Sequence, residues 1–248
     1  MADLKEADLF STVEQQRNHW YYFGKIKMLR SIILKSLQSS NIKGQFCGLD
    51  FGAGNGVISR SLGTCFAGRG WHWDLVDSGY LREESRDFYS TYKSIPVGQF
   101  YDLILAIDVL EHIQDDKATL ELLRAHLKPG GLLLVCVPAF QLLWSDHDVF
   151  LEHLRRYSRY RLLQCMHAAG LRPLNYQFFL VVLFPIAVLQ RLLKPRTGKP
   201  ESALKLLPVW LNSCLRGALA FERVLFRLFP VLSDLPGLSI IVIAESKF

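Results

Sequence analysis

Short apolar runs alternate with amphipathic stretches from residue 46 to residue 137, and this alternation constrains the fold more than any other feature of the chain. Continuous apolar runs predict buried strands, and apolar residues that recur every three or four positions predict helices. The strands are predicted at 46–51, 71–77, 101–107 and 131–137, and the helices near 55–67, around 80–92 and at 115–127. Strands that alternate with helices imply a mostly parallel sheet covered on both faces, so we expect a doubly wound α/β fold.

The flanking segments extend this core at both ends. A helix is predicted at 19–40 and another at 158–169, and two further strands are predicted near 173–179 and at the C-terminal LSIIVIAES. These runs locate six strands of a sheet that we expect to have seven. With 248 residues, half of them apolar, the chain has material for one α/β domain and accessory segments. We therefore divide it into an N-terminal helical lid (1–40), a core (41–179), a helical insertion before the last strand (180–236) and the last core strand (237–248).

The sequence GLDFGAGNG, residues 48–56, places glycines directly after the first predicted strand. In open α/β sheets a glycine-rich turn at this position lets a nucleotide approach the backbone. The spacing is GxGxG, and Val57 stands where the dinucleotide fingerprint GxGxxG requires Gly or Ala, which disfavours NAD. Asp77 ends the second predicted strand, where a carboxylate can accept hydrogen bonds from both ribose hydroxyls of an adenosine.

Asp50 indicates what else the ligand carries. Opposite charges attract strongly in a partly desolvated cleft, so an acid at this loop is unfavourable beside a pyrophosphate and favourable beside an ammonium group. S-adenosylmethionine is an adenosine derivative with an ammonium and a sulfonium. We therefore predict S-adenosylmethionine as the cofactor.

Four motifs follow one another in the core: LDFGAGNG, LVDSG, YDLILAIDVLEHI and LKPGGLLLVCVP. Together they resemble the class I S-adenosylmethionine-dependent methyltransferases over residues 46–138, which implies a Rossmann-like fold and enzymatic methyl transfer. The cofactor contacts that the resemblance implies are Asp50, Gly52, Gly54, Gly56, Asp77, Ser78, Asp108 and Val109. The stretch STYKSIPVGQF lacks the acid with which many of these enzymes bind adenine, so Ser90, Tyr92 or backbone groups are expected to take that role.

A narrower likeness concerns two segments outside the core motifs. HWYYFGK at 19–25 and LWSDHDVFLEHLRRYS at 143–158 resemble the HWWF and HxRRY patterns of a bacterial group within this class. Members of that group are often linked to lipid, quinone or surface-glycan pathways. The resemblance therefore implies a lipid or secondary-metabolite pathway.

Histidines after the strand predicted at 131–137 are candidates for the catalytic base. Methyl transfer requires an acceptor lone pair in line with the S–CH₃ bond, exclusion of water and often a base. Histidine can act as a base near neutral pH. We predict His147 or His153 as that base and place His112 in the acceptor site; the alternative for His112 is the first turn of a helix capped by Asp108.

Two further segments are predicted to contact the acceptor. Arg155 and Arg156, followed by Tyr157, begin the run RRYSRYR, and guanidinium groups bind phosphate or carboxylate with two hydrogen bonds. A solvated helix face with salt bridges to nearby acids is the alternative. Trp20 and Tyr21 are predicted to close over the site as an aromatic lid, or else to pack the N-terminal helix onto the sheet.

The insertion is both apolar and basic. Residues 151–248 carry a net charge of +9, whereas residues 1–150 carry −3. FFLVVLFPIAVL has 12 uncharged residues, too few to span a bilayer. In the following helix we expect Arg216, Arg223 and Arg227 to share one face, so the insertion is predicted to lie in a membrane interface anchored by Trp210. A helical cap on the sheet and a dimer interface are the alternatives.

The remaining features concern metal sites, nucleic-acid binding and localisation. The five cysteines form no CxxC pair and have no companion histidines at metal spacing, so we predict reduced thiols and no metal site. No Asn/Asp-Pro-Pro-aromatic tetrapeptide is present for a flipped base, so no nucleic-acid partner is expected. The polar N-terminus lacks the pattern of a signal peptide, which predicts a cytoplasmic protein attached peripherally to a membrane.

These observations lead to one main prediction. The chain is expected to be an S-adenosylmethionine-dependent methyltransferase that modifies a small hydrophobic or lipid-linked acceptor, by O-methylation. A membrane-attached cofactor-binding module without turnover and an NAD-dependent oxidoreductase are the alternatives. Motifs for a shared cofactor do not specify the acceptor or the oligomeric state.

Overall fold

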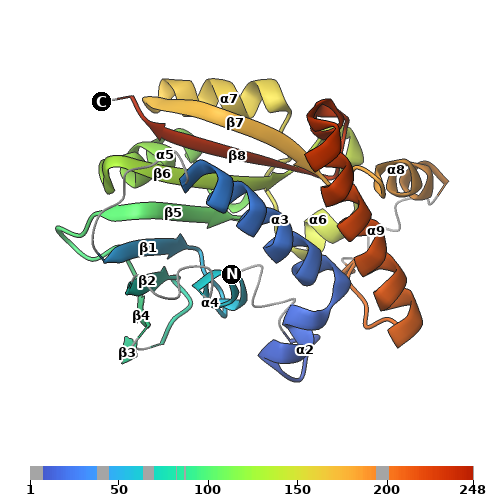
Figure 1. Ribbon diagram of the computed structural model, residues 1–248, viewed down its shortest axis with the longest axis horizontal. Coiled ribbons are helices and arrows are strands. Elements are labelled where there is room, and N and C mark those ends of the chain that lie inside the picture. The colour runs from blue at the N-terminus through green and yellow to red at the C-terminus, as the bar shows by residue number, and fades with distance from the viewer. Residues whose placement is uncertain are drawn as a thin grey trace.

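The computed structural model describes residues 8–37, 45–63, 70–81, 83–86, 88–193 and 201–247. An eight-stranded sheet crosses the molecule in the order β3-β4-β2-β1-β5-β6-β8-β7 (Figure 1). Its strands are β1 (Phe46–Phe51), β2 (Trp71–Val76), β3 (Glu84–Arg86), β4 (Tyr89–Tyr92), β5 (Tyr101–Ile107), β6 (Leu127–Pro138), β7 (Leu171–Phe179) and β8 (Ser239–Ser246). The predicted Rossmann-like class is confirmed, with one strand more than predicted.

The order of the strands determines where a ligand can bind. β4, β2, β1, β5 and β6 are parallel, whereas β8 runs antiparallel between β6 and β7. The chain leaves β1 toward β2 and later returns to β5 on the other side of β1. Ligands of open α/β sheets bind at such a reversal, at the carboxyl ends of the strands.

Helices cover both faces of the sheet (Figure 1). They are α2 (Val13–Asn18), α3 (Trp20–Leu37), α4 (Val57–Gly63), α5 (Asp116–Ala125), α6 (Asp146–Phe150), α7 (Arg159–Ala168), α8 (Phe184–Leu193) and α9 (Val209–Leu228), with the 3₁₀ turns η2 (Leu110–His112), η3 (Gln141–Leu143) and η4 (Pro230–Asp234). Because side chains alternate along a strand, Leu103 and Leu105 pack with α3, α4 and α9, whereas Ile104 and Ala106 pack with α5 and α7.

The stretch around 80–92 is not a helix, so that prediction is wrong. Within it β3 and β4 form an antiparallel pair, and β4 adds to the sheet parallel to β2. The sequence YSTY of β4 buries Ser90 and Thr91 and contains the aromatic and β-branched residues that suit a strand. Its backbone bonds to β2 outweigh the polar composition nearby. This hairpin supplies the two strands of the sheet that the apolar runs did not locate.

Two predicted boundaries also differ. The helix predicted at 115–127 is α5, which ends at Ala125, and the strand predicted at 131–137 begins earlier, because β6 already includes LKPGG. The helix predicted near 55–67 is described only as α4, and the remainder of that prediction lies outside the described residues.

The insertion packs on the N-terminal helix. A side chain at Gly24 of α3 would meet Leu219 Cδ1 of α9 at 2.2 Å, so the absence of a side chain allows close approach. The Arg216 guanidinium lies 3.7 Å from the centre of the Phe23 ring. Asn212 Oδ1 accepts a hydrogen bond of 2.8 Å from the backbone N–H of Trp20 at the start of α3. α3 and α9 therefore form one unit.

The outward face of α9 is apolar. Trp210, Phe221, Val224 and Leu228 are each more than half exposed, and their spacing places them on one side of the helix. Arg216, one of the three arginines expected to share a face of this helix, lies on the side of α9 that packs on α3. In the part of the chain that the structure describes, no helix combines the length and hydropathy needed to cross a membrane.

Candidate functional site

The glycine loop between β1 and α4 has a backbone that glycine alone adopts readily. Gly52, Gly54 and Gly56 have φ values of +75°, +53° and +70°. A Cβ at Gly52 would lie 2.4 Å from Cγ2 of Val109, which follows β5. The loop from β1 and the segment after β5 are therefore in contact at the reversal point, as the cofactor prediction requires.

Asp50 is buried at the carboxyl end of β1. Its Oδ2 has no hydrogen-bond partner among the described residues, although the carboxylate also bonds Ser59. Burial, and to a smaller extent the nearby Asp77, raises the pKa of Asp50 to about 6. A buried carboxylate oxygen without a partner suits a ligand that brings positive charge.

Asp77 closes the other side of the loop. Its Oδ2 accepts from the Gly54 backbone N–H at 3.0 Å and its Oδ1 from the Gly79 backbone N–H at 2.7 Å, while Ser78 between them is exposed. These bonds hold the carboxylate between the end of β2 and the glycine loop. A carboxylate has several acceptor sites, which is the chemistry that the predicted ribose hydroxyls require.

Asp108 lies at the start of the segment after β5, with a positive φ of 54°. Such backbone strain in a residue other than glycine is concentrated at functional sites. Its carboxylate forms an ion pair with the ammonium of Lys25, whose side chain is fully buried, and Lys25 also donates to the Tyr21 hydroxyl at 2.5 Å. Sequence reasoning missed Lys25, although it ends the HWYYFGK motif.

The lid also touches the glycine loop. Asn55 Nδ2 donates to Oε1 of the buried Gln16 of α2 at 2.5 Å, and Asn55 Oδ1 accepts from the backbone of Val57 at the start of α4. Gln16 and Asn55 were not predicted, because only their proximity in the fold marks them. The lid thus contacts the glycine loop through Gln16 and the segment after β5 through Lys25.

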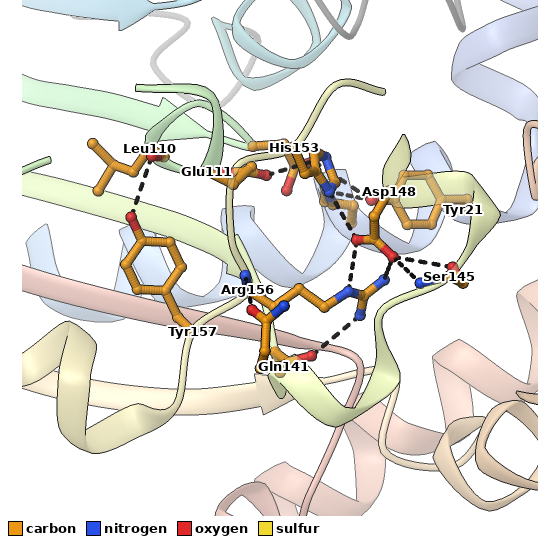
Figure 2. Close-up of polar contacts among 12 residues, drawn as sticks. Tyr21, Leu110, Glu111, Gln141, Ser145, Asp148, His153, Arg156 and Tyr157 are labelled. Carbon is orange, nitrogen blue, oxygen red and sulfur yellow. Dashed lines mark hydrogen bonds and ion pairs between the residues drawn. The ribbon is translucent and has the colours of Figure 1, made fainter. Parts of the chain in front are cut away.

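The segment after β6 is held by a buried ionic network (Figure 2). Asp148 accepts hydrogen bonds from Arg156 Nε at 2.6 Å, from Arg156 Nη2 at 3.0 Å and from His153 Nδ1 at 2.9 Å. Ser145 adds its backbone N–H and its hydroxyl. Burial alone would raise the pKa of Asp148, but the bonds from His153 and Arg156 hold it well below its usual range.

Arg155, Arg156 and Tyr157, which were predicted to contact the acceptor, bond other parts of the protein. Arg156 is engaged with Asp148 and with the carbonyl of Ala139. Arg155 pairs with Asp116 at 3.1 Å, and the buried Tyr157 hydroxyl bonds both Asp116 and the carbonyl of Leu110. These contacts fasten the segment to η2 and α5.

His147 and His153, the two predicted bases, differ in which ring nitrogen is engaged. His147 Nδ1 accepts from the backbone N–H of Ala203 in the insertion at 3.1 Å, so the neutral ring carries its proton on Nε2. Burial lowers the pKa of His147 to about 4. His153 donates from Nδ1 to Asp148, which leaves the lone pair of its neutral ring on Nε2.

A third group of side chains could hold a metal ion. Glu111, His112 and His153 each offer one ligand atom, and these atoms lie within 4.8 Å of one another. The pKa of His112 is lowered to about 4, chiefly by burial and then by His153. The cluster adjoins Asp108 at the carboxyl ends of β5 and β6, where the acceptor is expected.

The fold and this site define a class I S-adenosylmethionine-dependent methyltransferase. The family model described as "Methyltransferase domain" matches residues 19–176, more than half of the chain, and the chain belongs to that family. The positive-φ glycines, the unpartnered Asp50 oxygen and the position of Asp77 fit its cofactor, S-adenosylmethionine.

A curated relative is similar over part of the chain. The "Ubiquinone biosynthesis O-methyltransferase" of Coxiella burnetii is 28% identical over 144 residues, which cover 53% of this chain and 60% of the relative. The similarity thus spans less than two thirds of the relative's length.

Solved structures share the fold. A Galdieria sulphuraria protein described as a sarcosine dimethylglycine methyltransferase has a TM-score of 0.53 at 15% identity, covering 91% of this chain and 87% of its own. The cyclase SpnF has a TM-score of 0.50 at 14% identity, covering 88% and 80%. At these identities the likeness shows the fold and does not identify the acceptor.

Proposed function

We propose that this methyltransferase transfers a methyl group to an oxygen atom of a small hydrophobic or lipid-linked acceptor, and that it does so at a membrane surface. In the transfer, the acceptor oxygen forms a bond to the methyl carbon, the carbon–sulfur bond breaks, and sulfur keeps the electron pair as S-adenosylhomocysteine is released. The acceptor oxygen loses its proton. The name of the Coxiella burnetii relative supports oxygen as the accepting atom.

The packing of α9 is the observation that carries the membrane part. One face of α9 holds α3, the helix that brings Lys25 and Tyr21 to the site. The opposite face exposes an apolar stripe, which we define as Trp210, Phe221, Val224 and Leu228. The stripe lies in the part of the chain with the excess of positive charge, a combination that suits an anionic membrane interface.

If α9 lies on a membrane, α3 packed against it places the site next to the lipid. A hydrophobic acceptor would then reach the site without exposing its apolar surface to water, which is unfavourable. α8 supports this arrangement, because Ile186, Leu189 and Leu193 are also exposed.

Vesicle flotation tests the membrane part. Wild-type protein should float with vesicles that contain phosphatidylglycerol and bind neutral phosphatidylcholine vesicles at least tenfold less. The variant with Phe221, Val224 and Leu228 all changed to Ser should lose at least tenfold in binding. The matched control changes Leu81, Val97 and Phe100, which are exposed apolar residues outside the insertion, to Ser and should bind as wild type.

Equal flotation of the two triple variants would contradict the membrane proposal. So would a wild-type protein that forms a dimer by light scattering and a stripe variant that is monomeric, because a second copy would then cover the stripe.

We propose His153 as the base that takes the proton from the acceptor oxygen, because its Nε2 lies toward Glu111 of η2. The side chain of His147 is turned to the insertion by Ala203. With labelled S-adenosylmethionine and a lipid extract, His153→Asn should reduce product formation about 100-fold or more. The control His126→Asn alters an exposed histidine bonded to its own helix and should have no effect.

The affinity for S-adenosylhomocysteine should be the same in both variants and in wild type, since neither histidine is expected to touch the cofactor. Binding of S-adenosylhomocysteine without any labelled product would support the module without turnover instead. Binding of NAD alone would support the oxidoreductase.

A further inference from the structure

Glu111, His112 and His153 come together from two segments that are distant in the sequence. Glu111 and His112 lie on η2, directly after β5, and His153 lies after α6 (Figure 2 shows Glu111 and His153). The Leu154 backbone N–H donates to the Glu111 carbonyl at 2.7 Å, which fixes the two segments against each other. This backbone hydrogen bond holds the three side chains of the cluster near one another.

The orientation of His153 is set from outside the cluster. Its Nδ1 donates to Asp148, and Asp148 is held in turn by Arg156, so the Nε2 lone pair points inward and lies 3.9 Å from Glu111 Oε1. Histidines that bind metals almost always donate their other ring N–H to a carboxylate, a carbonyl or water. Asp148 is such a carboxylate.

His112 is oriented in the same way by the backbone. Its ring bonds the backbone of Glu152, and its buried Nε2 has no hydrogen-bond partner among the described residues. The bond to Glu152 is thus made by Nδ1. Two imidazoles and one carboxylate thus each offer a ligand atom, and these atoms lie within 4.8 Å of one another.

Buried charged groups surround the cluster. Glu111 itself is fully buried. The neighbouring ammonium of Lys25 is paired with Asp108, and the guanidinium of Arg156 is paired with Asp148.

We propose that Glu111, His112 and His153 bind a divalent first-row transition-metal ion such as Zn²⁺ or Mn²⁺. Two imidazoles and a carboxylate suit these ions better than Mg²⁺, which prefers oxygen ligands. Ligand atoms around such an ion are about 3 to 3.5 Å apart. Atoms that lie within 4.8 Å of one another therefore need to approach by up to about 1.3 to 1.8 Å. Three protein ligands leave positions open for another molecule.

The use of the ion rests on the proposed function. An oxygen of the acceptor would occupy an open position, and the cation would lower the pKa of that hydroxyl so that it enters as its anion, with the proton released to solvent. His153 would then act through the ion and would not itself take the proton. The site for the ion can be tested without any acceptor.

Calorimetric titration of the full, untagged and EDTA-dialysed chain with Zn²⁺, Mn²⁺ and Mg²⁺ tests the site. Wild type should bind one Zn²⁺ or Mn²⁺ per chain, at least tenfold more tightly than Mg²⁺. Glu111→Gln should weaken Zn²⁺ and Mn²⁺ binding at least tenfold. The matched control Glu121→Gln, which changes an exposed glutamate of α5 paired with Lys117, should bind as wild type.

Thermal unfolding and S-adenosylhomocysteine binding separate loss of the metal site from loss of the fold. Thermal unfolding and S-adenosylhomocysteine affinity should be similar in both variants, which shows that the cofactor site is intact. Absence of stoichiometric binding in wild type, or equal binding by Glu111→Gln and wild type, would overturn the metal site. Methyl transfer that is insensitive to EDTA would then leave the proposed function standing without it.

Discussion

Two buried aspartates at the carboxyl edge of the sheet show opposite behaviour. Asp50, at the end of β1, keeps an oxygen without a partner among the described residues, and burial raises its pKa to about 6. Asp148, in the segment after β6, is also buried, but His153, Arg156 and Ser145 bond it and hold its pKa well below the usual range. Both carboxylates are removed from water, but only that of Asp148 has hydrogen-bond partners on both oxygens.

The difference separates a binding surface from a supporting structure. A buried group that lacks partners is costly unless a ligand supplies them, whereas a fully bonded group rigidifies what surrounds it. We therefore expect substitutions near Asp148 to reduce stability, and substitutions near Asp50 to act mainly on cofactor binding.

Removal of the partner of Asp148 should have the largest effect. Arg156→Met leaves a buried carboxylate without its main cation and should lower the free energy of unfolding by about 3–5 kcal/mol. The control Arg159→Met removes an exposed arginine that bonds the Tyr176 hydroxyl and should cost less than about 1 kcal/mol. Urea unfolding followed by circular dichroism measures both; similar losses would show that the network does not support this segment.

The ion pair between Lys25 and Asp108 should be the next most sensitive. Lys25→Met removes a fully buried ammonium, but Asp108 is partly exposed, so a loss of about 2 kcal/mol is expected. Lys27→Met changes an exposed lysine two residues further along α3 and provides the control in the same unfolding experiment. A Lys25 variant as stable as the Lys27 variant would mean that the pair does not hold the lid.

The glycine loop should respond more in binding than in stability. Gly52→Ala introduces a Cβ at positive φ that meets Val109, so S-adenosylhomocysteine affinity should fall at least tenfold and unfolding should cost about 1–3 kcal/mol. Gly98→Ala has nearly the same φ, +77°, with no atom within 4 Å of the new Cβ. Calorimetry should show wild-type affinity for the Gly98 variant; equal losses would place the cofactor elsewhere.

The smallest effect should be the pH dependence that Asp50 causes. Its folded pKa of about 6 lies above the ordinary 3.8, so its contribution to stability declines as pH rises from about 4 through 6. A cationic cofactor favours the ionised carboxylate, so affinity for S-adenosylhomocysteine should increase from pH 5 to pH 7. Asp50→Asn should bind more weakly at pH 7 and flatten this slope. An unchanged slope would show that Asp50 does not face the ammonium group.

Local patterns in the sequence were sufficient for most of the fold. The apolar runs of β1, β5 and β6 are nearly or fully buried, and each is long enough to be recognised without its neighbours. The prediction failed at 80–92, where β4 becomes a strand because β2 offers it hydrogen bonds. Pairing between segments overrides a weak local preference.

The candidate site was predictable only on its cofactor side. Gly52 and Asp50 belong to a continuous motif, whereas Lys25 and Asp108 are 83 residues apart and meet only when α3 folds over the sheet. The cluster of Glu111, His112 and His153 likewise has no recognisable spacing in the chain. Such sets of residues carry no signal in one sequence, because no local pattern links their members.

The sequence by itself determined the doubly wound sheet and the glycine loop, because alternating apolar segments and glycines that adopt positive φ act over a few residues. Only the tertiary structure decided which charged groups are available to a ligand. It pairs Arg156 with Asp148 and Lys25 with Asp108, and it leaves an oxygen of Asp50 without a described partner. The physical reason is that burial and ion pairing depend on segments brought together by the whole fold.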